Sequence, residues 1–185
     1  MIDGVLSTFA SAGISTYIIP DDVTTIGDLV FADCHNLAEI TIGLNVVLIR
    51  DLAFYNCSGL TTAYIPSTIT TITAASYSNS IFYSCSSSLA IYTDVSNEGS
   101  KPSGWGTYWN YRTSGTKHTT NYGVSLEEYQ AIISQNQTTE FINEVIARNE
   151  EEMLVFRSVN GLGDLIIKVK EDQEIEALKE KKQRA

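Results

Sequence analysis

Three cysteines and two histidines are the side chains of this 185-residue chain best suited to nucleophilic or metal-dependent chemistry. Cys34, Cys57 and Cys85 lie 23 and 28 residues apart, whereas a zinc site usually contains closely paired ligands such as Cys-x-x-Cys. His35 directly follows Cys34, but neighbouring side chains at a turn tend to point apart, and His118 has no evident catalytic partner. The spacing therefore predicts neither a catalytic pair nor a metal site.

Carboxylates are numerous, but they occur in runs such as Asp21-Asp22 and Glu150 to Glu152, which are typical of solvated turns and helix faces. The chain has no glycine-rich phosphate loop or metal-binding helix motif. We predict no catalytic residue, no metal and no cofactor, and hence that the protein is not an enzyme. A hydrolase of surface polymers remains an alternative, which would require two carboxyl groups roughly 5–9 Å apart in a cleft near Trp105.

The cysteines belong instead to a repeat of 23 residues. Seven positions of one block, Ile19, Val23, Ile26, Phe31, Cys34, Leu37 and Ile40, recur as Ile42, Val46, Ile49, Phe54, Cys57, Leu60 and Ala63. A third block begins at Ile65 and takes five extra residues around 74–80. A block that cannot close its own core must stack on its neighbours, so the period predicts a solenoid. The cysteines should form a buried packing column, although coil spacing alone would not forbid a disulfide.

The residue pattern of each block resembles that of a known repeat family. Leu37-x-x-Ile40-x-Ile42 and Leu60-x-x-Ala63-x-Ile65 match the L-x-x-L-x-L core of leucine-rich repeats. The runs 19–28, 31–37 and 53–60 resemble the BspA-like class, and 101–110 resembles the ending often found after such arrays. The resemblance covers about residues 14–123. It implies a binding module that is extracellular or displayed on a surface, rather than a catalyst.

Each coil should contribute one short strand at its L-x-x-I-x-I stretch and a second ridge, as at Val23 to Ile26. Stacking then aligns outward residues in two columns, which are Thr16, Glu39, Thr62 and Ala90, and Ile18, Thr41, Tyr64 and Tyr92. The candidate ligand-binding residues are Glu39, Thr41, Thr62, Tyr64 and Tyr92, together with Trp105 and Trp109. The two tryptophans could either form a sugar-stacking platform or seal the end of the solenoid.

Both ends of the array should be capped, because a solenoid end exposes strand edges and apolar core. Residues 1–18 resemble a degenerate repeat, in which Leu6 and Phe9, one helical turn apart, cover the first coil. Residues 95–123 predict an irregular aromatic cap, since Pro102 and three glycines between 99 and 106 should break any strand.

A different composition begins at Ser125. Ser125 and Glu128 have capping-box spacing, with Val124 and Tyr129 at staple positions, and predict a helix from Leu126 to about residue 135. A polar break at 136–139 should precede a second helix. Residues 153–159 and 165–169 predict a hairpin across an Asn-Gly turn, or a continued helix, and 171–184 a last helix. The predicted fold class is α+β, with a leucine-rich-repeat β-solenoid at 1–123 and a small α/β-hairpin tail at 124–185.

The composition of the chain excludes some classes of binding partner. The hydrophobic content of 43% is that of a globular protein, and the net charge of −10 provides no basic stripe for nucleic acid. No signal peptide and no apolar run of the roughly 20 residues that span a bilayer is visible, so we expect no membrane insertion.

These features predict a non-enzymatic interaction or adhesion module that binds a protein or glycan surface. Residues 125–185 would dock it to a larger assembly or form a homo-oligomer. The alternative is a structural component of a phage virion or tail, which assembly in a reducing cytosol with free cysteines would suit. The expected location is extracellular, on a cell surface or on a virion.

Overall fold

The computed structural model describes residues 4–10 and 13–148. The chain divides into two compact units, Met1–Tyr129 and Gln130–Ala185, of which we describe each by itself. The hairpin and the last helix expected between 153 and 184 lie outside the described residues.

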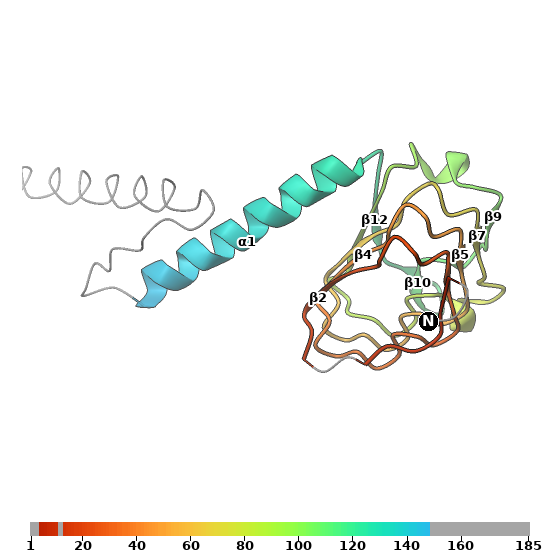
Figure 1. The fold of residues 1–185 in the computed structure, drawn as a ribbon, viewed down its shortest axis with the longest axis horizontal. Helices are drawn as coiled ribbons and strands as arrows, with labels where there is room; N and C mark the ends of the chain where they lie inside the picture. Colours follow the sequence, from red (N-terminus) through yellow and green to blue (C-terminus); the bar gives the residue numbers. More distant parts are fainter. Residues whose placement is uncertain (1–3, 11–12, 149–185) are drawn as a thin grey trace, which may run out of the picture. The chain divides into compact units, whose positions relative to one another are not determined.

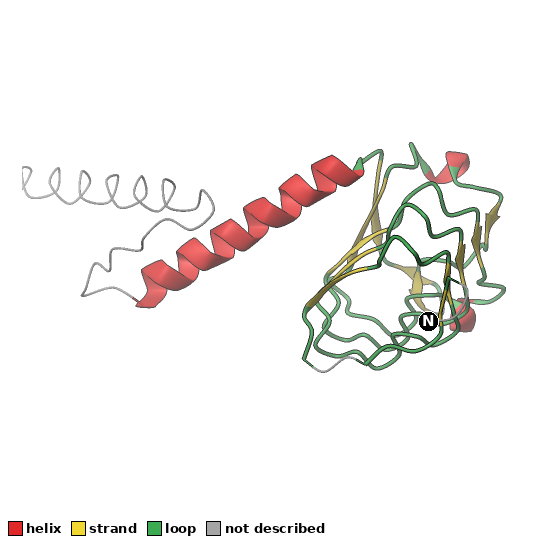
Figure 2. Cartoon of the chain, viewed as in Figure 1, coloured by secondary structure: helices red, strands yellow, loops and turns green. Residues whose placement is uncertain are grey.

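The first unit is a stack of coils whose short strands align into two parallel sheets (Figures 1 and 2). One sheet has the order β1 (Val5–Leu6), β3 (Thr25–Ile26), β5 (Leu48–Ile49), β7 (Thr71–Ile72) and β9 (Gly104–Trp105). The other has the order β12 (Thr119–Tyr122), β8 (Ala90–Thr93), β6 (Thr62–Tyr64), β4 (Glu39–Thr41) and β2 (Thr16–Ile18). An antiparallel ribbon joins β10 (Tyr111–Thr113) to β11 (Thr116–Lys117).

The register follows the sequence repeat. Glu39 pairs with Thr62, a separation of 23 residues, and Thr62 pairs with Ala90, a separation of 28. The five extra residues of the third block are therefore absorbed between strands, where the 3-10 helix η1 (Tyr77–Asn79) forms without burying a residue. The main chain rejoins the stack at Asn79, whose carbonyl accepts the Leu52 N–H at 3.4 Å. The insertion thus changes one corner and leaves the registers on both sides intact.

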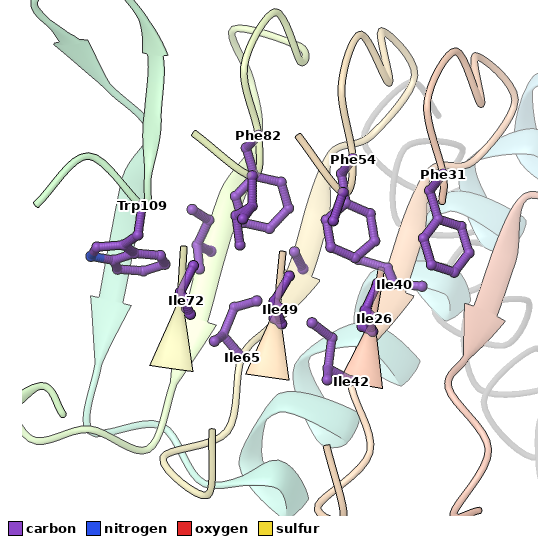
Figure 3. Packing of buried hydrophobic residues seen from close by; sticks show 14 of the residues in the cluster. Ile26, Phe31, Ile40, Ile42, Ile49, Phe54, Ile65, Ile72, Phe82 and Trp109 are labelled. Carbon is purple, nitrogen blue, oxygen red and sulfur yellow. The ribbon is translucent and has the colours of Figure 1, made fainter. Parts of the chain in front are cut away.

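The core consists of rows of apolar side chains stacked from coil to coil, and in several rows the side chains are identical. Ile26, Ile49 and Ile72 form one row, and Phe31, Phe54 and Phe82 form another, with Trp109 after Phe82 (Figure 3). The ring centroids of Phe31 and Phe54 are 5.0 Å apart, and those of Phe54 and Phe82 are 5.2 Å apart. This offset stacking buries the phenylalanine rings completely, so the apolar columns that the repeat requires are present.

The cysteine column is confirmed as buried packing. Cys34, Cys57 and Cys85 are all free and buried. The Cys57 thiol donates to the Phe31 carbonyl at 3.0 Å, and the Cys85 thiol donates to the Phe54 carbonyl at 2.9 Å. The hydrogen bond with Cys85 and burial raise the pKa of Cys57, which keeps this thiol protonated and unreactive.

The N-terminal cap is extended, so the helical turn expected between Leu6 and Phe9 is wrong. The reason is that β3 needs backbone partners: the N–H groups of Thr24 and Gly27 donate to the carbonyls of Gly4 and Leu6 at 2.8 and 2.9 Å. The expected covering role of Phe9 is confirmed, because its ring centroid lies 4.6 Å from that of Phe31, the first ring of the core row.

The expectation that the aromatic cap at 95–123 is irregular and without strands is wrong. The cap contains the strands β9 and β12. β9 pairs with β7, aligning Trp105 with Ile72. Pro102 precedes the strand, and its carbonyl accepts the Trp105 N–H at 3.0 Å. Gly104 permits the pairing, because an added Cβ would lie 2.3 Å from the Thr70 carbonyl oxygen. The cap is thus built as a further coil of the stack.

His118 packs against Phe82, the last phenylalanine of the row Phe31, Phe54 and Phe82. Its Nε2–H donates to the Phe82 carbonyl at 3.1 Å, and its ring meets the Phe82 ring edge-on at 6.2 Å. Burial lowers the pKa of His118, and the nearby positive charge of Arg112 lowers it further, against the raising effect of the Phe82 carbonyl. The histidine is therefore a neutral core residue.

The helix α1 (Leu126–Arg148) runs without interruption, so the break expected at 136–139 is wrong. The hydroxyls of Thr138 and Thr139 donate to the carbonyls of Ser134 and Gln135, four residues earlier, at 2.8 Å each. These bonds satisfy the polar side chains within the helix. The capping box is confirmed: Glu128 N–H donates to Ser125 Oγ at 3.2 Å, and Ser125 N–H donates to Glu128 Oε2 at 2.8 Å.

Replacing Gly104 by Ala should destabilise the stack by about 1–3 kcal/mol, because the new methyl group would collide with a backbone oxygen that cannot easily move. Urea unfolding followed by tryptophan fluorescence measures the loss, since Trp105 and Trp109 both lie in this cap. Gly99→Ala is the matched control, as the nearest atom to its added Cβ belongs to the Asn97 side chain at 3.2 Å. Equal stability of the two variants would contradict the role of Gly104.

Stability should fall as the pH falls from about 7.5 to about 5, because the lowered pKa of His118 means that the unfolded chain binds a proton that the folded chain does not. This group can contribute at most about 1.4 kcal/mol per pH unit. Urea unfolding of His118→Gln should show a shallower slope with pH than the native chain. His35→Gln is the control, since His35 is exposed. Parallel slopes for all three proteins would refute the assignment.

Candidate binding face

The outward side of the β2–β12 sheet brings together the five candidate residues that the sequence placed on it. Strand β4 supplies Glu39 and Thr41, β6 supplies Thr62 and Tyr64, and β8 supplies Tyr92. The register aligns Thr16, Glu39, Thr62 and Ala90 in one column, and Ile18, Thr41, Tyr64 and Tyr92 in the other, as predicted. Strand β12 extends these columns by Thr119 and Asn121, which the sequence analysis did not include. We call this surface the sheet face.

The two tryptophans are not on the sheet face. Trp105 lies in the other sheet and is 2% exposed, and Trp109 is fully buried. The Trp105 indole N–H donates to the Ile69 carbonyl at 2.7 Å, and the two rings meet edge to face at 4.8 Å. Of the two interpretations offered by the sequence, sealing of the core accounts for these positions.

A tyrosine that the sequence analysis did not assign to the site covers the middle of the sheet face. Tyr129, in the first turn of α1, has its ring centroid 5.2 Å from that of Tyr64 and 5.3 Å from that of Tyr92. Tyr129 and Tyr64 are each 1% exposed, and Thr41 is 5% exposed. Part of the predicted binding surface is therefore occupied by the chain itself, while Glu39, Thr62 and Tyr92 remain partly exposed.

The buried tyrosines are held in their neutral form. Burial raises the pKa of Tyr64 to about 12, and the negative charge of Asp94 adds to the effect. Burial likewise raises the pKa of Tyr129 to about 12, against the hydrogen bonding of Thr62. Asp94 itself accepts the Ser67 N–H at 2.6 Å and the Ser67 hydroxyl at 2.8 Å. At neutral pH the face thus presents aromatic, hydroxyl and carboxylate groups.

These groups suit binding rather than proton transfer. His35 bonds to Ser58, with 3.1 Å between Nδ1 and Oγ, and His118 is part of the core. Among the residues that the structure describes, no cluster of histidine, cysteine and acidic side chains could hold a metal ion. The hydrolase alternative placed its carboxyl groups near Trp105, but that residue is buried.

A signal in the sequence could have identified one of the missed residues. Tyr129 occupies the fourth helical position after the Ser125 cap, where an apolar side chain commonly packs back on the preceding structure. The residues of β12 gave no such signal, because Thr119–Tyr122 shows no apolar–polar alternation and its partner β8 is about 30 residues earlier.

Removing the ring of Tyr129 should expose Tyr64 and lower its pKa from about 12 toward the ordinary value of about 10. The expected result for Tyr129→Ala is seen by spectrophotometric titration of the tyrosines. Tyr129→Phe keeps the ring and serves as the control, in which Tyr64 should titrate as in the native chain. An unchanged Tyr64 titration in Tyr129→Ala would show that this contact does not cover it.

No helix in the described part of the chain is long and apolar enough to cross a membrane.

Comparison with known proteins gives one match. The model of the BspA type leucine rich repeat region matches residues 6–97 with six copies, a range that contains the strands β2 to β8. No curated protein and no solved structure matches the chain. The match to this family suggests a protein-interaction or adhesion module. Members of the family are typically non-enzymatic and are typically found on surfaces or outside the cell. Residues 6–97 are thus a BspA type leucine rich repeat region.

Proposed function

We propose that the chain is a non-enzymatic adhesion module, a short solenoid that binds a protein partner through the sheet face. The observation that carries the proposal is the alignment of outward side chains in two columns on a sheet whose inward side chains already form the core. Because the core does not depend on the outward residues, their identities are available for recognition.

The composition of the sheet face supports a protein partner. Tyr92 supplies a partly exposed aromatic ring of the kind enriched at interface centres, while Thr62 and Glu39 supply hydrogen-bonding groups around it. The Tyr129 ring packs against Tyr92 and also against Tyr64, the residue paired with Tyr92 on the next strand, so the Tyr92 ring is held in place before binding. A preordered aromatic loses less conformational entropy when a partner binds.

The second part of the proposal is that the chain after the stack joins the module to a larger assembly or to copies of itself. The capping box fixes the start of α1, and the first turn is anchored by Tyr129 on the sheet face. In the sequence, the spacing of Phe141, Ile142, Val145 and Ile146 predicts an apolar stripe along a helix. An apolar stripe of this kind favours packing against another helix.

Binding can be tested with a panel of purified extracellular-matrix and cell-surface proteins, using surface plasmon resonance with the full chain immobilised. The double variant Glu39→Arg and Tyr92→Ala should weaken any specific binding by tenfold or more, the loss typical of an interface hot spot. Ser114→Arg, at an exposed turn, is the control and should bind as the native chain does. Binding that is equal in all three proteins would place recognition elsewhere.

The assembly role can be tested by light-scattering mass of the full chain beside a chain ending at residue 135. This end point retains the capping box and Tyr129, so the first unit keeps its own contacts. Oligomers of the full chain alone are the expected result, and they would also suit the alternative of a virion component. Monomers in both cases would contradict self-assembly through the tail.

A further inference from the structure

A second aromatic surface lies at the corner of the coils where the third block carries its insertion. Tyr55 and Tyr83 occupy equivalent positions in successive coils, and their rings are stacked at 6.3 Å with 11° between their planes. Tyr77, from the insertion, continues the row at 6.5 Å from Tyr83. We call Tyr55, Tyr83 and Tyr77 the tyrosine edge. It is separate from the sheet face in every residue.

The insertion contributes to this edge and not to the core. The helix η1 contains Tyr77 and buries none of its residues, and Tyr77 is 41% exposed. Its shape is fixed nonetheless, since Ser76 Oγ donates to Asn79 Oδ1 at 2.6 Å and Asn79 Nδ2 donates to Asp51 Oδ2 at 2.8 Å. This ordered corner presents an exposed ring beside two others. Packing of the core does not explain the exposed ring, because η1 buries none of its residues.

Carboxylate and amide side chains belong to the same corners of the coils as the rings. Asn56, which follows Tyr55, donates through Nδ2 to Asp33 Oδ1 at 2.7 Å, and Asn79 and Asp51 form the second such pair. In the exposed Asp33–Asn56 pair, the amide oxygen and the remaining carboxylate lone pairs can accept, and the second amide hydrogen can donate. The Asp51–Asn79 pair instead orders the corner, because Asp51 Oδ1 is buried and Asn79 Oδ1 already accepts from Ser76. A hydroxyl group, which both donates and accepts, matches such a pair, whereas a guanidinium or ammonium group only donates.

We propose that the tyrosine edge binds a neutral glycan, with the apolar face of a sugar ring on the exposed Tyr77 ring and the sugar hydroxyls on the Asp33–Asn56 pair. Aromatic rings are apolar on their faces and accommodate such stacking without removing polar groups from water. Charge excludes an anionic polymer, because Asp33 and Asp51 flank the row and residues 1–124 carry nine acidic and four basic side chains. This site goes beyond the protein-binding role proposed for the sheet face.

The test uses the full chain with three neutral hexasaccharides, cellohexaose, maltohexaose and chitohexaose, and measures affinity by isothermal titration calorimetry and saturation-transfer NMR. At least one should bind, and Tyr77→Ala should weaken that binding by about tenfold through loss of one stacked ring. Because η1 buries none of its own residues, this variant should keep the fold. Tyr77→Phe retains the ring and should bind within about twofold of the native chain.

Tyr92→Ala is the matched control on the sheet face, and it should leave glycan affinity unchanged. The proposal is overturned if no hexasaccharide binds at about 10 mM, or if Tyr77→Ala binds as tightly as the native chain. Binding of a hexa-arginine peptide that depends on Tyr77, in place of the sugars, would also overturn it and indicate a basic protein segment. The sheet face is tested separately, by the binding of proteins and not of sugars to the double variant Glu39→Arg and Tyr92→Ala.

Discussion

The backbone hydrogen bonds between successive coils are the constraint on which the rest of this structure depends. Each short strand contributes only two to four residues, so it is stable only when its N–H and carbonyl groups pair with the coils before and after it. Pairing at a fixed register brings chemically similar side chains directly over one another. The phenylalanine row, the cysteine column and the outward columns of the sheet face are consequences of this one requirement.

The same requirement explains which parts of the fold could be predicted. Wherever the 23-residue period is intact, the sequence determines the register, and Thr41, Tyr64 and Tyr92 align as expected. Where the period is lost, local propensity misleads. By propensity Gly104 should end a strand. In the structure the strand pairs because Gly104 has no Cβ, which would collide with the Thr70 carbonyl oxygen. Thr138 and Thr139 suggest a helix break, yet their hydroxyls bond within the helix.

The candidate site illustrates a different limit. Sequence periodicity identifies which residues point outward, but it does not show what covers them. Tyr129 is nearly 40 residues after Tyr92 in the chain, and only the path of residues 95–125 brings it back to the sheet. The exposed part of the sheet face is therefore set by a long-range contact, which no spacing rule in the repeat contains. Burial of Trp105 and Trp109 has the same origin, since both continue rows that begin in earlier coils.

The third block shows that one corner of a coil can be lengthened while the strands on either side keep their partners. The stack resumes at Asn79 as though the extra residues were absent, because the next hydrogen bonds depend on where the chain rejoins and not on the path it takes. Residues 75–78 are thus a natural graft position. Foreign loops, epitopes or affinity tags inserted there would be displayed between two fixed anchor points, and the corner gives evolution room to acquire new contacts without rebuilding the interior.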